Sequence, residues 1–247
     1  MKKLFLPLSI VCLFTSILLF TKVRAGISQP TIVASAQLVK ADSAATVSEA
    51  DSVTNVLYDS LELDKLGLTK AALLYAYKGH ENLVQKGVLS NPDILTVCDF
   101  TQPSTSKRMY IIDIKNFKVL MNTYVAHGKN SGLDYAENFS NAPESLETSL
   151  GFYITKNTYI GKHGLSLKLS GLDRGFNDNA ESRDVVVHGA KYVGDQRVGS
   201  YMGRSFGCPA VPQRLASKVI QLIKNGTCLF IYHPSQSYFI GSTILNG

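Results

Sequence analysis

One cysteine stands in a setting that suits a nucleophile. Cys208 lies in the run GRSFGCPAVPQ, residues 203–213, between Gly207 and Pro209. Glycine frees the backbone from Cβ constraints and proline stiffens the exit, so this turn can hold a thiol outward. The same residues also fit an ordinary turn with a buried cysteine, and both interpretations stay open at this point.

A histidine nearby in the sequence provides the base that such a thiol needs. His188 ends the apolar run DVVVHGA, and a glycine-rich loop, residues 189–207, leads from it to Cys208. A neighbouring imidazolium lowers the pKa of a thiol, and the imidazole can then protonate a departing amine. The backbone N–H groups of Gly207 and Cys208 are candidates for an oxyanion hole. The pair therefore predicts covalent attack on an acyl carbonyl.

Two further His-Gly pairs lie at or near the ends of predicted strands, where functional sites are usually built. His127 and His163 either line the cleft or are structural histidines held by hydrogen bonds. With His188 and Cys208 they have the ligand types of a zinc site, but no H-x₃-H or C-x₂-C spacing supports one. We therefore expect no metal and no cofactor.

The elements that must position these groups predict a mainly β fold with peripheral helices, in the α+β class. Period-two alternation begins near Ile94, and the stretch 150–161 predicts a strand pair with a turn at Asn157. The remaining candidate strands are 94–100, 108–114, 117–126, 165–172, 184–190 and 227–234, with a helix over 212–224.

The N-terminal part divides into three segments. Residues 1–25 match a secretory signal, since Lys2 and Lys3 precede an apolar stretch and small residues mark a cleavage site; an uncleaved anchor is the alternative. Residues 26–51 predict a flexible leader. Residues 52–93 predict two or three short helices, interrupted near Gly67, that either support the β domain or dock another envelope protein. Residues 94–235 form the main domain, and 236–247 a C-terminal tail.

Charge and cysteine content narrow the possible partners. The net charge is +6, but the first 25 residues hold four cations and no acids, so the rest carries 21 basic and 19 acidic residues. A net charge of +2 gives no support for nucleic-acid binding. Three cysteines remain after the signal, and an odd number indicates a free thiol. Cys98 and Cys228, each in an apolar run, either form a disulfide or are reduced core residues.

The ordered blocks of the sequence resemble the L,D-transpeptidases, the cysteine enzymes of peptidoglycan cross-linking. The run VVVHGAKYVGDQRVGSYMGRSFGCPAV looks like their H-G…S-x-G-C active-site block. Blocks such as SKRMYIIDIKN, TYVAHGKNSG and FSNAPESLETSLGFYIT extend the similarity over about 56–233, and resemble the murein L,D-transpeptidase catalytic-domain branch. The resemblance implies the β-sandwich fold of these enzymes, here with an N-terminal helical segment.

The resemblance also implies roles for individual residues. Cys208 matches the nucleophile and His188 the general base and acid, with the backbone carbonyl at Gly189 orienting the imidazole. Gly207 and Cys208 match the oxyanion-hole amides. Ser205 matches the serine of S-x-G-C, either fixing the loop or contacting substrate.

This sequence departs from the family pattern at two places. Phe206 stands where many members have histidine, and Pro209-Ala210 stands where many have an aliphatic residue and an arginine. Arg204 or Arg214 are candidates to replace that arginine. The substrate-binding candidates are Ser205, Arg204, His127 and His163.

The function implied is that of an exported enzyme of the periplasm or cell envelope. It transfers an acyl group from a stem tetrapeptide through a Cys208 thioester, releases D-Ala and forms 3→3 cross-links. The alternatives are an L,D-carboxypeptidase or endopeptidase using the same Cys/His pair, and a non-catalytic peptidoglycan-binding scaffold. The expected partners are peptidoglycan stem peptides, with membrane contact only through the signal peptide; the sequence does not indicate an oligomeric state.

Overall fold

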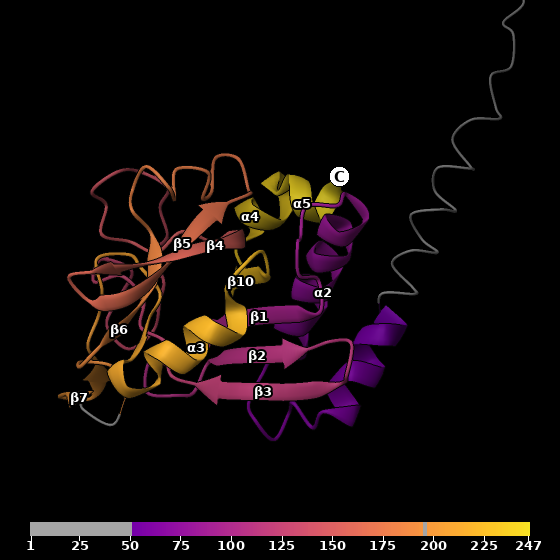
Figure 1. Cartoon of the computed structure of the whole chain (residues 1–247), viewed down its shortest axis with the longest axis horizontal. Helices are drawn as coiled ribbons and strands as arrows, with labels where there is room; N and C mark the ends of the chain where they lie inside the picture. Colours follow the sequence, from indigo (N-terminus) through magenta and orange to yellow (C-terminus); the bar gives the residue numbers. More distant parts are fainter. Residues whose placement is uncertain (1–50, 195–196) are drawn as a thin grey trace, which may run out of the picture. The chain divides into compact units, whose positions relative to one another are not determined.

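The computed structural model describes residues 51–194 and 197–247 (Figure 1). The predicted signal peptide and all of the predicted leader except residue 51 lie outside these residues. Within the described part, none of the helices combines the length and the apolar character of a membrane span.

One mixed sheet of eight strands forms the centre of the fold, in the order β3-β2-β1-β10-β4-β5-β6-β9 (Figure 1). The pairs β1–β10 and β6–β9 are parallel and the other neighbours are antiparallel. The strands are β1 (Ile94–Asp99), β2 (Met109–Asp113), β3 (Lys118–Thr123), β4 (Gly151–Gly161), β5 (Gly164–Gly171), β6 (Val186–Ala190), β9 (Ala210–Pro212) and β10 (Cys228–Tyr232).

The two edges of this sheet meet beside the turn that carries Cys208. Ala126, just beyond β3, forms an antiparallel bridge with Ala210 of β9. The sheet is therefore nearly closed, and the predicted mainly β fold class with peripheral helices is confirmed. The short strands β7 (Arg197–Val198) and β8 (Tyr201–Met202) form a separate ribbon.

The helices pack against strands of the sheet. Residues 51–60 are helical, turns follow over 61–67, and Gly67 has a φ of +86°, so the predicted interruption is confirmed. The other helices are α2 (Lys70–Gln85), the 3₁₀ turn η1 (Gln213–Leu215), α3 (Ala216–Ile223), α4 (Gln236–Gly241) and α5 (Thr243–Asn246). Helix α2 begins where the Thr69 hydroxyl accepts a hydrogen bond from the Ala72 N–H.

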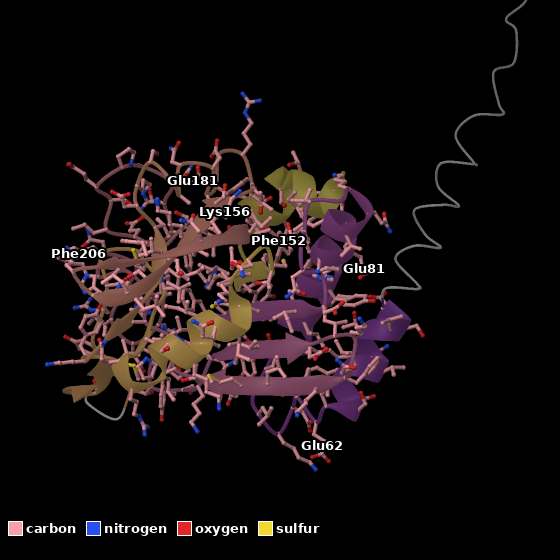
Figure 2. All side chains as sticks on the ribbon, viewed as in Figure 1. Glu62, Glu81, Phe152, Lys156, Glu181 and Phe206 are labelled. Atoms are coloured by element: carbon pink, nitrogen blue, oxygen red, sulfur yellow. The ribbon has the colours of Figure 1, made fainter. Side chains whose placement is uncertain are left out.

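Helix α2 packs closely on the sheet at Gly79. A Cβ at this position would lie 2.0 Å from the Phe152 ring of β4, and that ring stacks on Phe230 of β10 at 4.1 Å. Any larger residue at 79 would push α2 off the sheet. Through α2, the N-terminal helical segment therefore supports the β domain. This contact is distant from the turn that carries Cys208: Glu81 on α2 and Phe206 in that turn lie on opposite sides of the view in Figure 2.

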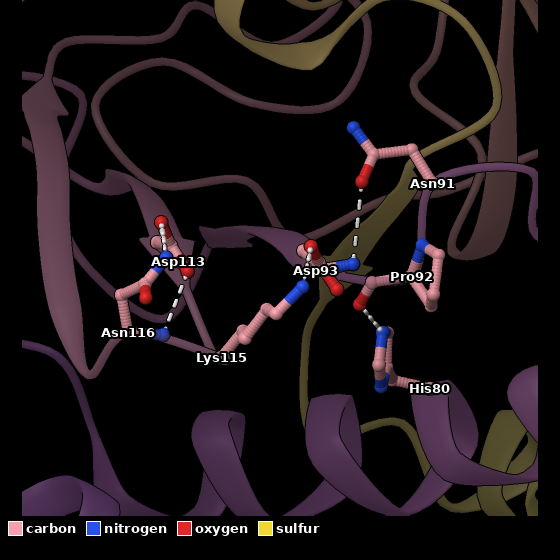
Figure 3. Close-up of polar contacts among 7 residues, drawn as sticks. All are labelled: His80, Asn91, Pro92, Asp93, Asp113, Lys115 and Asn116. Atoms are coloured by element: carbon pink, nitrogen blue, oxygen red, sulfur yellow. Dashed lines mark hydrogen bonds and ion pairs between the residues drawn. The ribbon is translucent and has the colours of Figure 1, made fainter.

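Polar contacts fix the connection from α2 into the sheet (Figure 3). His80 Nε2 lies 2.8 Å from the Pro92 carbonyl oxygen, and Lys115 Nζ lies 3.2 Å from Asp93 Oδ2. The backbone N–H of Asn116 donates to Asp113 Oδ1, which closes the β2–β3 hairpin.

Two predicted elements differ in the structure. The stretch predicted as a strand pair is the single strand β4, with an irregularity in its pairing to β5 between Thr155 and Thr158. Asn157 continues the strand, and the chain turns later, at residues 162–163, just before Gly164, whose φ is +77°. The predicted C-terminal tail folds as α4 and α5, because Asp173 accepts hydrogen bonds from the Tyr238 and Ser242 hydroxyls and draws this segment into the core.

Cys98 and Cys228 are free, fully buried thiols on the neighbouring strands β1 and β10. In the parallel register Cys228 pairs with Leu95, three residues from Cys98. Three residues of strand span about 10 Å, which exceeds the Cα separation of a disulfide. Both are therefore reduced core residues, the second of the two alternatives.

Candidate active site

Cys208 and His188 line the same cavity, of about 1230 Å³. His188 lies in β6 and pairs in register with Ala210 of β9, so the turn that precedes β9 places Cys208 against the start of β6. The far half of the β4–β5 hairpin forms another wall, with His163 among the lining residues. The topology thus joins two residues that lie on either side of a long glycine-rich loop.

The Cys208 thiol is partly buried and points toward the backbone at the start of β6. Its Sγ donates to the Asp184 carbonyl oxygen at 3.6 Å. Burial raises the pKa of the Cys208 thiol, while a hydrogen bond from the Val186 N–H and the charge of Arg183 partly oppose this rise. The resting group at neutral pH is therefore a thiol that needs a base.

His188 has the protonation pattern of a general base. Its Nδ1 lies 3.1 Å from the Gly189 carbonyl oxygen, which only accepts, so Nδ1 carries the proton and Nε2 is left with its lone pair. Burial lowers the pKa of His188, and electrostatic interactions with the neighbouring His163 and Lys162 lower it further. The His163 ring stacks on the His188 ring at 4.3 Å and covers one of its faces.

The Ser205 hydroxyl closes the turn that carries the thiol. Its Oγ donates to the Cys208 carbonyl at 2.6 Å and accepts from the Gly207 N–H at 3.1 Å. The backbone of Ser205 is also held in place, because its N–H donates a hydrogen bond to the His127 carbonyl at 2.9 Å. These contacts make Ser205 a loop-fixing residue, although it also lines the cavity.

The oxyanion-hole prediction needs a correction at Gly207. Its N–H is engaged by Ser205 inside the turn, so it does not point at a reacting carbonyl. The N–H of Cys208 is the remaining candidate of the predicted pair. The Gly207 carbonyl is also held, by the Thr148 hydroxyl at 3.3 Å.

His127 and Arg204 have mainly structural contacts. His127 is fully buried, does not line the cavity, and its Nδ1 accepts from the buried Arg108 guanidinium at 2.7 Å. Arg204 lines the cavity, but its Nη1 donates to the carbonyls of Lys129 and Gly132, each at 2.9 Å. The sequence left two roles open for His127, lining the cleft or holding the structure, and these contacts support the structural role.

The other arginine considered, Arg214, lies in η1 and is not among the residues that line the cavity. Arg214 does not line the cavity, and the Arg204 guanidinium already bonds two carbonyls. Neither arginine is therefore placed to substitute for the arginine that this sequence lacks.

Arg183 is a site residue that the sequence reasoning missed. Its guanidinium donates to the carbonyls of Ser140 and Glu147 and to the hydroxyls of Ser149 and Ser145, at 2.5–3.0 Å. It thereby ties the segment 140–149 to the wall of the cavity, where its charge favours the Cys208 thiolate. Its only signal in the sequence is a cation just before the apolar run that ends at His188.

Gly207 is required by its backbone and by its neighbour. Its φ is +121°, and a Cβ would lie 2.8 Å from the Glu147 carbonyl oxygen. We expect Gly207→Ala to lower the free energy of unfolding by about 1–3 kcal/mol, measured by urea denaturation. Gly87→Ala is the matched control, because Gly87 has a φ of +64° with nothing within 4 Å of a Cβ. Equal losses for the two variants would contradict the role of the Glu147 contact.

Residues 51–194 and 197–247 contain no group of three or more His, Cys, Asp or Glu side chains placed to hold a metal ion. His127 does not line the cavity that His163, His188 and Cys208 line, so the four residues considered as zinc ligands do not share one site.

One family model matches more than half of the chain. A family model described as the L,D-transpeptidase catalytic domain matches residues 64–232. No curated protein matches the sequence. Among solved structures, an L,D-transpeptidase from Mycobacterium smegmatis is 14% identical with a TM-score of 0.36, over 57% of this chain and 59% of that chain.

Two other solved structures are similar to the same degree. The helical cell shape determining protein Pgp2 from Campylobacter jejuni is 12% identical with a TM-score of 0.41, over 68% of this chain and 62% of that chain. L,D-transpeptidase 1 from Mycobacterium tuberculosis is 13% identical with a TM-score of 0.32, over 57% and 62% of the two chains. The chain therefore spans about three fifths of the length of these solved proteins.

Proposed function

The chain belongs to the L,D-transpeptidase catalytic domain family, and from this premise we propose that it is a cysteine-dependent acyltransferase acting on peptidoglycan stem peptides. The observation that carries the proposal is the shared cavity of Cys208 and His188, with the imidazole held on the Gly189 carbonyl. A thiol and a base with its lone pair free, opening on one cavity, suit nucleophilic attack on an acyl group.

The first half-reaction forms a thioester. His188 Nε2 takes the proton of the Cys208 thiol, and the sulfur attacks the carbonyl of the third stem residue, a diamino acid. The developing oxyanion accepts a hydrogen bond from the Cys208 N–H. The imidazolium returns its proton to the departing amine, the C–N bond breaks, and D-Ala leaves.

The second half-reaction consumes the thioester. An amine of a second stem peptide attacks the thioester carbonyl, His188 accepts the amine proton, and the Cys208 sulfur leaves as the restored thiol. The product carries a 3→3 cross-link. Attack by water in the same geometry gives a tripeptide, the L,D-carboxypeptidase alternative, and an existing cross-link as first substrate gives an endopeptidase.

We propose that the enzyme works outside the cytoplasmic membrane. Residues 1–25 have the charge and apolar pattern of a secretory signal, and the substrate is a component of the cell envelope. Detection of a mature protein beginning near residue 26 in the envelope fraction supports this placement, whereas recovery of the full-length chain in the cytosol contradicts it.

A product assay tests the proposed function. The purified protein is incubated with disaccharide-tetrapeptide, and the products are separated and identified by mass spectrometry. We expect D-Ala release together with a dimer whose two stems are joined through their third residues. Accumulation of tripeptide without dimer favours the carboxypeptidase, and binding without any D-Ala release favours the non-catalytic scaffold.

A further inference from the structure

The far half of the β4–β5 hairpin forms a basic wall of the active-site cavity. The first five residues of β4 are buried, and from Lys156 onward most of the strand is exposed as it leaves the body of the sheet. Lys156 and Lys162, from the hairpin, and Lys168, from β5, all line the cavity. Lys156 and Glu181, both labelled in Figure 2, line the same cavity. We call these three residues the lysine wall.

The lysine wall gives the cavity an excess of positive charge. The lining contains five cations against two carboxylates, Glu181 and Asp184. The two arginines among the cations, Arg183 and Arg204, already bond backbone carbonyls and serine hydroxyls. The ion pairs of the described residues involve none of the three lysines. The charges of these lysines are therefore not neutralised by an ion pair within the described residues.

The charge of one member of the lysine wall, Lys162, reaches the reacting groups. The charge of Lys162 contributes, after burial, to the lowered pKa of His188, and it also favours the thiolate of Cys208. Lys168 Nζ lies 5.8 Å from the centre of the Tyr159 ring, which holds that side chain along the hairpin. Charges beside a partly enclosed cavity act on a bound ligand more strongly than the same charges on an open surface.

We propose that the lysine wall selects acyl-donor stem peptides whose second and third residues carry free carboxylates over peptides in which those carboxylates are amidated. This inference rests on the proposed function, since it concerns the peptide that reaches Cys208. Stem peptides contain an acidic second residue and a diamino acid with a second carboxyl group, and either group is charged when free and neutral when amidated. Lysine ammonium groups are mobile point charges, so they discriminate by charge rather than by a fixed two-point geometry.

Binding measurements separate this inference from catalysis. The Cys208→Ala protein retains the cavity and lacks the nucleophile, so the Kd of an uncleaved tetrapeptide is measured by calorimetry. We expect the peptide with free carboxylates to bind about tenfold more tightly than its amidated form at low ionic strength, and the ratio to shrink in 0.5 M salt, where the Debye length is only about 4–5 Å.

Substitutions then assign the difference to the lysine wall. In the same background, K156Q/K168Q is expected to reduce the ratio to about threefold or less by weakening binding of the free-carboxylate peptide only. Lys162 is left in place because its charge also acts on Cys208 and His188. Lys218→Gln, an exposed lysine of α3 outside the cavity, is the matched control and is expected to keep the tenfold ratio.

The outcomes are distinguishable from those of the proposed function. Equal Kd values for the two peptides, or an unchanged ratio in K156Q/K168Q, overturn the inference even when the wild-type protein releases D-Ala. A charge-dependent Kd ratio in a protein that releases no D-Ala supports the selection of carboxylates and contradicts the proposed acyltransferase activity.

Discussion

Replacing Cys208 with alanine is expected to reduce D-Ala release from a tetrapeptide by at least about 10⁴-fold, down to the background rate. The proposed reaction passes through a thioester, and alanine offers no atom that forms one. Removal of the nucleophile from a serine enzyme with a comparable acyl mechanism lowers kcat by about 10⁶-fold. The measurement is the initial rate of D-Ala release with purified variant and wild-type proteins.

Cys98→Ala is the matched control for this loss. Cys98 is a fully buried thiol of β1 that does not line the cavity, and burial raises its pKa to about 12. We expect this variant to release D-Ala at a rate within about twofold of the wild type, with a lower melting temperature from the lost packing. Substantial D-Ala release by the Cys208→Ala protein would contradict the assignment of the nucleophile.

Replacing His188 with glutamine is expected to lower kcat/KM by about 10²–10⁴-fold, the usual size of a general acid–base contribution. Glutamine keeps a hydrogen-bond donor for the Gly189 carbonyl but supplies no group that takes the thiol proton. The pH profile gives a second readout. In the wild type the rate needs neutral His188, so the acid limb should fall through a midpoint below 6.5, because burial lowers the pKa of this imidazole. The variant should lack that limb.

His163→Gln separates catalysis from ring packing. His163 stacks on His188 but lies on the exposed hairpin, and no hydrogen bond fixes its tautomer in the described structure. We expect this variant to lose less than about tenfold in kcat/KM and to keep the acid limb. A larger loss for His163→Gln than for His188→Gln would reverse the two roles.

Local sequence patterns predicted the elements that depend on nearby residues. The glycine and proline around Cys208 indicate a special turn, and the apolar run ending at His188 indicates a buried strand. The structure contains both the turn and the strand, and both flank the cavity. The interruption at Gly67 was also predictable, because a positive φ is a property of the single residue.

The features that the sequence did not reveal depend on residues far apart in the chain. Strand β4 runs on through Asn157 because β5 pairs with it on both sides of the irregularity, a constraint absent from the local pattern. The C-terminal helices pack inward because Asp173, more than sixty residues earlier, accepts their hydroxyl groups. Local secondary-structure propensity alone does not reveal such distant contacts, so it predicts a tail for this segment.

The site shows the same division between local and distant information. The S-x-G-C pattern identified Ser205 and Gly207 but did not reveal that the Ser205 hydroxyl takes the Gly207 N–H, which removes this amide from the oxyanion hole. Arg183 acts through the segment 140–149, about forty residues earlier, and no short motif records that contact.

Intact-protein mass spectrometry tests the central claim most directly. The wild-type protein and Cys208→Ala are each mixed with a tetrapeptide donor and, separately, with a carbapenem, and quenched in acid to preserve thioesters. We predict a covalent adduct on the wild type alone, with peptide mapping placing it on Cys208, and release of D-Ala from the tetrapeptide. No adduct with either compound, from folded wild-type protein whose Cys208 thiol still reacts with an alkylating reagent, would contradict the thioester mechanism.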